Sequence, residues 1–335
     1  MPKRSPSRKP DLPPKAPAPR ALGSPSPAPR RALGDTHNFG RRVELRGQRV
    51  VKPRPVLWEW LLLSNDSPLR ELLASLAQED ELGERAFSFL PTLRFYEGRT
   101  DGAFEVQRAR LIPLGRLTSA ERVELARIVG RSLALWSWLG VADLHWENLV
   151  LGRGPRGHLV FGPLDIEMIL ADLSLPTETK LLPDADPEYA TLCRHAAGVR
   201  RVLPYLGKPV PPGLLVAMAA AYEDTLSLLD RHAPAIAAVL SQLPGLDTTP
   251  LRVLLRSTGD YVTADGSRLW PPLLDAELEQ LQRGDIPYFF RLYGHPGIHY
   301  FTDPTLTQVR RLPLHGDTPQ LSPLLDLSRD LRSPS

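Results

Sequence analysis

A long helix, a polar loop and a hairpin follow one another in the middle of the chain, and this order most constrains the fold. Thr118–Glu121 fits a capping box, in which a hydroxyl and a carboxylate satisfy the free amides at a helix start. Apolar side chains then recur at helical spacing until Gly140, which predicts the helix end. The polar loop Asp143–Asn148 comes next, and a hairpin over Leu149–Phe161 separates it from Asp165.

The polar residues of this segment match the needs of phosphoryl transfer. In kinases a loop aspartate precedes a metal-binding asparagine by about five residues, and a second metal-binding aspartate follows. Asp143 and Asn148 have this separation, and Asp165 lies past the hairpin. Their oxygens are hard ligands that suit Mg²⁺. An isolated pair of this kind also occurs by chance where an aspartate caps a turn, so the kinase-like interpretation depends on the order of elements.

A lysine at the end of a predicted strand supplies another part of such a site. Val43–Leu45 and Arg49–Lys52 flank a glycine-containing turn and predict a β-hairpin. A kinase keeps its phosphate-binding ammonium on a strand of its smaller lobe, which suggests this role for Lys52. The acid that pairs with it would be Glu59 or Glu71, and the sequence does not choose between them.

These patterns predict an α+β, two-lobed, kinase-like fold with a small mixed β lobe and a larger, mainly helical lobe. The predicted organisation is a disordered Pro/Arg-rich tail over 1–33, a small nucleotide-binding lobe over 34–113, a helical catalytic lobe over 114–315 and a flexible C-terminus over 316–335. Further helices are predicted over 57–63, 69–76, 214–230 and 234–243, and further strands over 93–96 and 104–111. Beyond Pro211 the chain is predicted to be mainly helical.

Charge and composition exclude several classes of protein. Residues 1–31 hold eight basic and one acidic residue (+7), which leaves 33 basic and 37 acidic residues (−4) for the rest. The high pI is therefore a property of the tail, and no specific nucleic-acid-binding fold is indicated. No membrane-spanning segment and no P-loop motif is found, and the single Cys193 predicts a buried hydrophobe rather than a zinc site or disulfide. These features fit a cytoplasmic protein.

Four segments between residue 34 and about residue 290 are similar to the dehydratase domain of class II (LanM-type) lanthipeptide synthetases. They are Gly34–Val43 together with Val51–Arg54, Asp143–Asn148 together with Asp165–Glu167, Leu251–Thr258, and Gly284–Phe289. They resemble, in that order, the family's Gly-Asp-x-His-x-x-Gly and Lys-Pro-Arg segments, its Asp-x-His-x-x-Asn loop, its Arg-Val-x-x-Arg element and its Gly-Asp-Ile-Pro-Tyr-Phe hallmark.

The resemblance implies a lipid-kinase-like fold and a two-step reaction. Such an enzyme uses ATP and Mg²⁺ to phosphorylate Ser or Thr of a ribosomally made precursor peptide, and then eliminates the phosphate to leave dehydroalanine or dehydrobutyrine. The residues implied in phosphorylation are Lys52, Asp143, His145, Asn148 and Asp165, with Glu167 supporting the Mg²⁺ site of Asn148 and Asp165. Those implied in elimination are Asp35, His37, Arg252 and Thr258. A guanidinium such as that of Arg252 binds a phosphate dianion bidentately.

The chain also departs from this family. Ser257 stands where the family usually has proline, and the domain is shorter. We expect no cyclase domain, so any rings would be closed by a separate cyclase. Two alternatives stay open: a kinase-like phosphotransferase that stops at phosphorylation, and a degenerate subunit that binds nucleotide or peptide for a partner.

Overall fold

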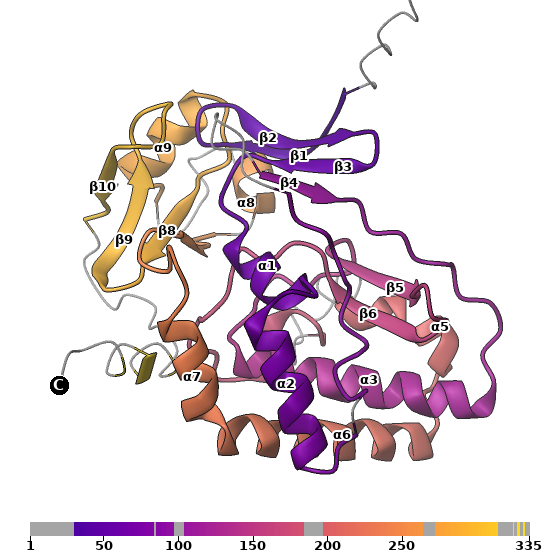
Figure 1. Cartoon of the computed structure of the whole chain (residues 1–335). Helices are drawn as coiled ribbons and strands as arrows, with labels where there is room; N and C mark the ends of the chain where they lie inside the picture. The colour runs from indigo at the N-terminus through magenta and orange to yellow at the C-terminus, as the bar shows by residue number, and fades with distance from the viewer. Residues whose placement is uncertain are drawn as a thin grey trace, which may run out of the picture.

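The computed structural model describes residues 30–83, 85–96, 104–183, 197–256, 258–263, 272–313, 324, 327, 328 and 331. Over these residues the chain has mixed α and β structure with antiparallel sheets (Figure 1). Most of the predicted N-terminal tail and C-terminus, together with Cys193 and Ser257, lies outside the described residues. None of the described helices has the length and apolar character needed to cross a membrane.

The first sheet contains Lys52 and has the strand order β1-β2-β3-β4. Its strands are β1 (Arg30–His37), β2 (Arg41–Arg46), β3 (Arg49–Lys52) and β4 (Phe104–Gln107). The predicted hairpin is confirmed, since Leu45 pairs with Val50 across the turn. β1 begins four residues before the predicted start of the small lobe. The strand predicted over 93–96 makes only isolated bridges, and the one predicted over 104–111 ends at Gln107.

Two predicted helices lie between β3 and β4 in the chain, α1 (Leu57–Leu63) and α2 (Pro68–Glu79). Ser67 caps α2, and its hydroxyl accepts the backbone N–H of Arg70 at 3.4 Å. Trp58 and Leu62 of α1 are buried, so this helix joins the sheet to the main core.

A pair of 20-residue helices forms the base of the molecule in Figure 1, α3 (Ser119–Trp138) and α6 (Pro212–Arg231). The predicted capping box is confirmed, because the amide of Thr118 donates to Glu121 Oε2 (2.8 Å) and the amide of Glu121 donates to Thr118 Oγ1 (3.2 Å). Gly130 lets the helices approach closely, since a Cβ there would lie 2.1 Å from the carbonyl oxygen of Met218. After α6, the chain turns into α7 (Ala233–Ser241).

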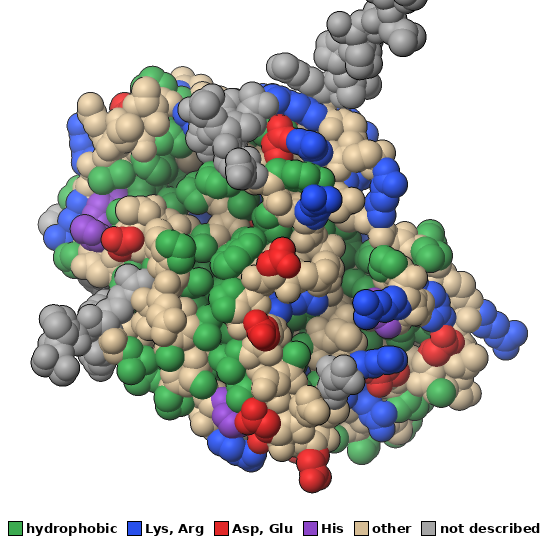
Figure 2. All heavy atoms as spheres, viewed as in Figure 1, with side chains coloured by type: hydrophobic (Ala, Val, Ile, Leu, Met, Phe, Trp, Pro, Cys, Tyr) green, Lys and Arg blue, Asp and Glu red, His purple; other side chains and the backbone are tan. Residues whose placement is uncertain are grey.

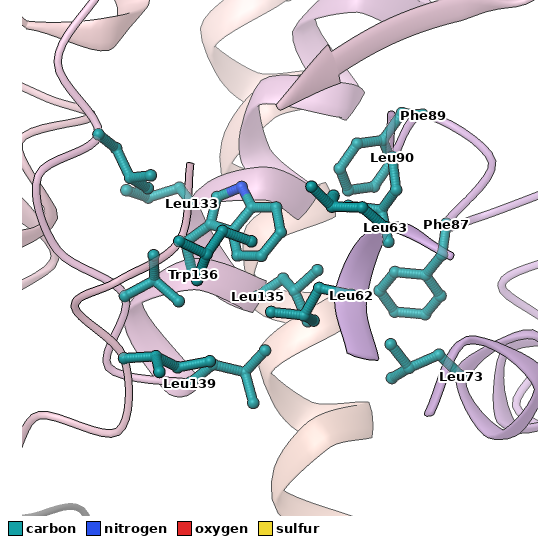
Figure 3. Close-up of a cluster of buried hydrophobic side chains, with 14 of the residues drawn as sticks. Leu62, Leu63, Leu73, Phe87, Phe89, Leu90, Leu133, Leu135, Trp136 and Leu139 are labelled. Atoms are coloured by element: carbon teal, nitrogen blue, oxygen red, sulfur yellow. The ribbon is translucent and has the colours of Figure 1, made fainter. Parts of the chain in front are cut away.

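One hydrophobic cluster joins α1, α2, the turn around residue 88 and α3 (Figure 3). Its labelled members are Leu62, Leu63, Leu73, Phe87, Phe89, Leu90, Leu133, Leu135, Trp136 and Leu139. The cluster therefore contains residues from both sides of position 113, and the division into two lobes there stays a prediction.

The hairpin after the polar loop is confirmed as β5 (Leu149–Arg153) and β6 (Leu159–Pro163). The prediction of a mainly helical chain beyond Pro211 is wrong for residues 251–311. This region forms a second sheet of order β10-β9-β8-β7 with the helix α9 (Asp275–Gln282). Its strands are β7 (Leu251–Val253), β8 (Phe289–Leu292), β9 (His295–Phe301) and β10 (Val309–Arg311). Aromatic residues that favour a pleated surface flank the turn at Gly294, which has a φ of +75°.

The remaining elements are short. They are η1 (Pro176–Thr179), η2 (Gly198–Arg201), α5 (Leu203–Leu206) and α8 (Thr258–Thr263). On the face in Figure 2, basic side chains lie over the first sheet and around the β5–β6 hairpin, with acidic side chains interspersed.

Candidate active site

The ammonium of Lys52 lies at the centre of the site. Lys52 ends β3, and its side chain is only 6% exposed. Its Nζ donates to Glu59 Oε1 at 2.9 Å, to Asp165 Oδ1 at 2.9 Å and to the Leu164 carbonyl at 3.1 Å. An ammonium has three donors, so these three acceptors satisfy it completely.

The structure selects Glu59 as the acid that pairs with Lys52. Glu59 lies in the first turn of α1 and is fully buried, whereas Glu71 of α2 is exposed to solvent. A buried carboxylate requires a charged or hydrogen-bonded partner, and the cation at the end of β3 supplies one.

Arg54 is a residue whose role the sequence did not reveal. Its Nε donates to Glu167 Oε1 at 2.7 Å and its Nη2 to Glu59 Oε1 at 2.5 Å, and the same Nη2 also bonds Asp165 Oδ1. In the sequence, Arg54 stood out only as the last residue of the Lys-Pro-Arg segment, directly after Lys52 and Pro53. With Arg252 it completes a buried cluster of equal positive and negative charge, made of Lys52, Arg54, Arg252, Glu59, Asp165 and Glu167.

Opposite charges within this cluster hold Lys52, Asp165 and Glu167 in their ionised forms. Burial alone would lower the pKa of Lys52, but Asp165 and Glu59 outweigh it and the pKa is raised. Burial alone would raise the pKa of Asp165, but Lys52 and Arg54 hold it well below its ordinary value. The pKa of Glu167 is lowered in the same way, against burial, by Arg54 and Arg252. Lys52, Asp165 and Glu167 are therefore charged near neutral pH.

The polar loop is joined to this cluster at the base of the β5–β6 hairpin. The backbone N–H of Leu164 donates to the carbonyl of Asn148 at 3.1 Å, which places Asn148 beside the residue preceding Asp165. Asn148 Nδ2 also donates to the backbone carbonyl (3.0 Å) and to Oδ2 (3.3 Å) of Asp143. Lys52, Leu164, Asn148 and Asp143 thus form one continuous chain of hydrogen bonds.

Asp143 is held in an unfavourable backbone conformation. Its φ of +64° lies in the left-handed region, which costs a non-glycine residue about 1–3 kcal/mol and is found where surrounding contacts enforce it. Lys180 Nζ lies 3.5 Å from its Oδ1, and His145 Nε2 lies 4.0 Å from its Oδ2. The carboxylate therefore faces two further polar side chains besides Asn148.

A cavity of about 130 Å³ lies between the two sheets and borders the same cluster. The predicted site residues that line it are Asp35, His37, Asp165, Glu167 and Arg252. Arg252 donates from Nη1 to Glu167 Oε2 at 3.1 Å and lies 5.2 Å from the ring centre of Tyr288. The cavity thus brings three of the four elimination residues implied by the family resemblance next to Asp165 and Glu167 of the implied Mg²⁺ site.

His37 is held in one tautomer by a backbone carbonyl. Its Nδ1 is 2.8 Å from the carbonyl oxygen of Ile286, and since a carbonyl only accepts, Nδ1 carries the hydrogen. Burial and the nearby charge of Arg252 lower the pKa of His37 below 6.5. Near neutral pH the ring is therefore uncharged, with its lone pair on Nε2.

Two distant segments fix the position of His37. The carboxylate of Asp285 accepts the backbone N–H groups of Phe39 (2.7 Å) and Gly40 (2.8 Å), and the backbone N–H of Ile286 donates to the carbonyl of Thr36 at 2.8 Å. The first and fourth of the segments that resemble the dehydratase family are thus bonded directly to each other. The sequence indicated Asp285 only as part of the segment Gly284–Phe289. Its hydrogen bonds to the backbone of Phe39 and Gly40 are seen only in the structure.

Thr258 is the predicted elimination residue that the structure does not bring to the cavity. It begins α8, and it is not among the described residues that line the cavity. The helix is held elsewhere, because the hydroxyl of Tyr261 donates to buried Glu277 Oε1 at 2.7 Å. The described lining also does not include Lys52, Asp143, His145 or Asn148.

The oxygens of Asp165 and Asn148 fit a magnesium ion that is shared with phosphates. Within the described part of the chain no group of three or more His, Cys, Asp or Glu side chains could hold a metal ion by itself. Mg²⁺ is commonly bound by one or two carboxylates together with substrate phosphates. Lys52 and Arg54 bond Oδ1 of Asp165, and the amide nitrogen of Asn148 bonds Asp143. The oxygens that would bind Mg²⁺ are therefore Asp165 Oδ2 and Asn148 Oδ1.

Neither the models of known protein families nor the curated proteins give a match to this chain.

Proposed function

We propose that this chain is a LanM-like peptide dehydratase, which phosphorylates Ser or Thr of a precursor peptide with ATP and Mg²⁺ and then eliminates the phosphate. The two-lobed, lipid-kinase-like fold belongs to the same proposal. The observation that carries it is the contact of Lys52 with both Glu59 and Asp165. A strand lysine paired with a helix glutamate, next to a metal-binding aspartate, is the arrangement that phosphoryl transfer uses in protein kinases.

In the first step each charged group has a separate role. Lys52 would give the donor that now bonds Asp165 to the phosphates of ATP, while Glu59 keeps the ammonium oriented. Asn148 and Asp165 would hold Mg²⁺, which would supply neutralisation of phosphate charge. Asp143 accepts the proton of the attacking hydroxyl, and its fixed backbone and its contact with Asn148 position the carboxylate.

In the second step the phosphopeptide loses phosphate. Nε2 of His37 takes the α-proton, the electron pair of the broken C–H bond forms the Cα=Cβ bond, and the Cβ–O bond breaks. Arg252 binds the departing phosphate, which takes the electrons of that bond. The lowered pKa of His37 supports this assignment, since only the neutral ring can accept a proton.

The position of Thr258 favours a second candidate, a phosphotransferase that stops at phosphorylation. If all four elimination residues are needed in one place, the described arrangement supplies only Asp35, His37 and Arg252. Both candidates use the same nucleotide site and differ only in the fate of the phosphopeptide.

Mass spectrometry of the product separates these candidates. The protein is incubated with ATP, Mg²⁺ and peptides encoded beside its gene, with Lys52→Met and Asp143→Asn as controls. Loss of water from the peptide supports dehydration, and added phosphate without loss of water supports the phosphotransferase. An unchanged peptide mass in every reaction contradicts both, and points to the degenerate subunit. The proposed setting is the cytoplasm, and a separate cyclase would act on the dehydrated product.

A further inference from the structure

A larger groove opens beside the cavity that His37 and Arg252 line, which we call the reactive cavity. The groove has no role in the proposed chemistry. Its volume of about 660 Å³ is within the range of about 300–1,000 Å³ that is usual for ligand sites. We call it the side groove and define it by Asn38, Arg41, Pro250, Tyr288, Phe301 and Leu306. Asn38, Arg41 and Tyr288 also line the reactive cavity, so the two spaces adjoin and share a wall.

One wall of the side groove is a loop held rigidly by a single carboxylate. Asp303 accepts the backbone N–H groups of Thr305 (3.0 Å), Thr307 (3.0 Å) and Gln308 (2.6 Å). Leu306, within this loop, has a φ of +60°, a left-handed conformation that leucine rarely adopts. Backbone strain of this kind persists only where surrounding bonds enforce it, and it is common where a loop clamps a ligand.

The opposite wall is fixed in a similar way. Asn38 is buried and has a φ of +49°, and the two residues after it are bonded to Asp285. Arg41 joins the walls, since its Nη2 donates to the carbonyl of Pro304 at 2.8 Å. Both walls are therefore shaped before any ligand arrives, which reduces the entropy lost on binding.

The lining shows which kind of ligand the side groove suits. Prolines, Phe301 and Leu306 supply apolar surface, and the charged side chains among the described lining residues are Arg41 and Arg54, with no acidic one. An extended peptide with apolar side chains and a carboxylate matches this surface. The basic N-terminal tail of the chain does not match, because its positive charges would face arginines.

We propose that the side groove binds the part of the substrate peptide that flanks the reacting Ser or Thr, and that Arg41 selects an acidic side chain in it. This inference rests on the proposed function, because the flank reaches the groove only when the hydroxyl residue occupies the adjoining cavity. The groove thus determines which Ser or Thr of a peptide is modified.

Fluorescence anisotropy without nucleotide tests this selection. The probes are two fluorescein-labelled synthetic peptides that share Ser, Leu and Phe, one with Asp and the other with Lys beside the apolar pair. We expect the wild-type protein to bind the Asp peptide about tenfold more tightly. Arg41→Gln should remove this preference, and Arg41→Glu should reverse it. Arg127→Glu is the matched control, since Arg127 lies on α3 with 52% of its side chain exposed.

A second variant tests the apolar wall. Leu306→Gly removes the side chain while glycine accepts the left-handed backbone without strain. We expect it to weaken both peptides by about tenfold and to keep the preference for Asp, since burial of apolar surface supplies affinity and Arg41 supplies selectivity.

Three results would overturn the inference: equal or undetectable binding of both probes by the wild type, a preference that survives Arg41→Gln, or equal effects of Arg41→Glu and Arg127→Glu. Because ATP is absent, these results are independent of catalysis. Selective binding without any phosphorylation of the bound peptide would count against the proposed function instead.

Discussion

The buried pair of Lys52 and Glu59 makes a sharp prediction for the variant Glu59→Gln. Glu59 is fully buried, and its Oε1 accepts hydrogen bonds from both Lys52 and Arg54. Glutamine keeps the shape and an acceptor oxygen but removes the negative charge. Three buried cations would then face only the carboxylates of Asp165 and Glu167.

The expected loss of stability follows from this imbalance. Breaking a buried ion pair by removing one partner costs about 3–5 kcal/mol, because the other charge stays buried without compensation. Since glutamine retains an acceptor, we expect the lower end, about 3 kcal/mol. Removing both charges, in Lys52→Met with Glu59→Gln, should cost less than the sum of the single changes by at least about 1 kcal/mol.

Urea unfolding followed by tryptophan fluorescence measures these free energies, and buried Trp58 next to Glu59 supplies a local signal. The control is Glu71→Gln on α2, which is exposed and should change the free energy of unfolding by less than about 0.5 kcal/mol. If Glu59→Gln is as mild as this control, the buried charge cluster does not exist as described.

Three further predictions concern separate parts of the molecule. NMR titration should give His37 a pKa below 6.5, and Arg252→Gln should move this pKa part of the way back towards 6.5. The neutral ring then contributes stability above pH 6.5 that is lost as the pH falls through the lowered pKa, and a measured pKa at or above 6.5 would refute the assignment. Arg252→Ala should slow elimination by about 10²–10³-fold and accumulate phosphopeptide in mass spectra, whereas full-rate dehydration would contradict its role. Gly130→Ala should cost about 1–3 kcal/mol in thermal unfolding, because its Cβ would lie 2.1 Å from the Met218 carbonyl oxygen; unchanged stability would show that the helices are further apart.

Features that depend on neighbours in the sequence were predictable. The capping box at Thr118, the hairpin that ends in Lys52 and the hairpin after the polar loop all form from adjacent residues, and the structure has each of them. The polar loop could be placed because it lies between two such elements.

Features that depend on distant pairing were not predictable. β7 has three residues, and its partner strand is about forty residues away, since Leu251 pairs with Arg291. The choice of Glu59 over Glu71 depends on which helix covers the strand end. Arg54 bonds carboxylates more than one hundred residues away, so its role could not be deduced from local spacing.

Binding of Mg²⁺-ATP, measured by titration calorimetry on the wild type, Asp165→Asn and Asp143→Asn, tests most directly whether the Lys52 cluster is a nucleotide site. We expect the wild type to bind Mg²⁺-ATP. Asp165→Asn should bind it at least about tenfold more weakly, because a metal-binding carboxylate is lost. Asp143→Asn should still bind Mg²⁺-ATP but should not transfer phosphate. A wild-type protein that does not bind Mg²⁺-ATP, or an Asp165→Asn variant that binds it equally well, would contradict the account.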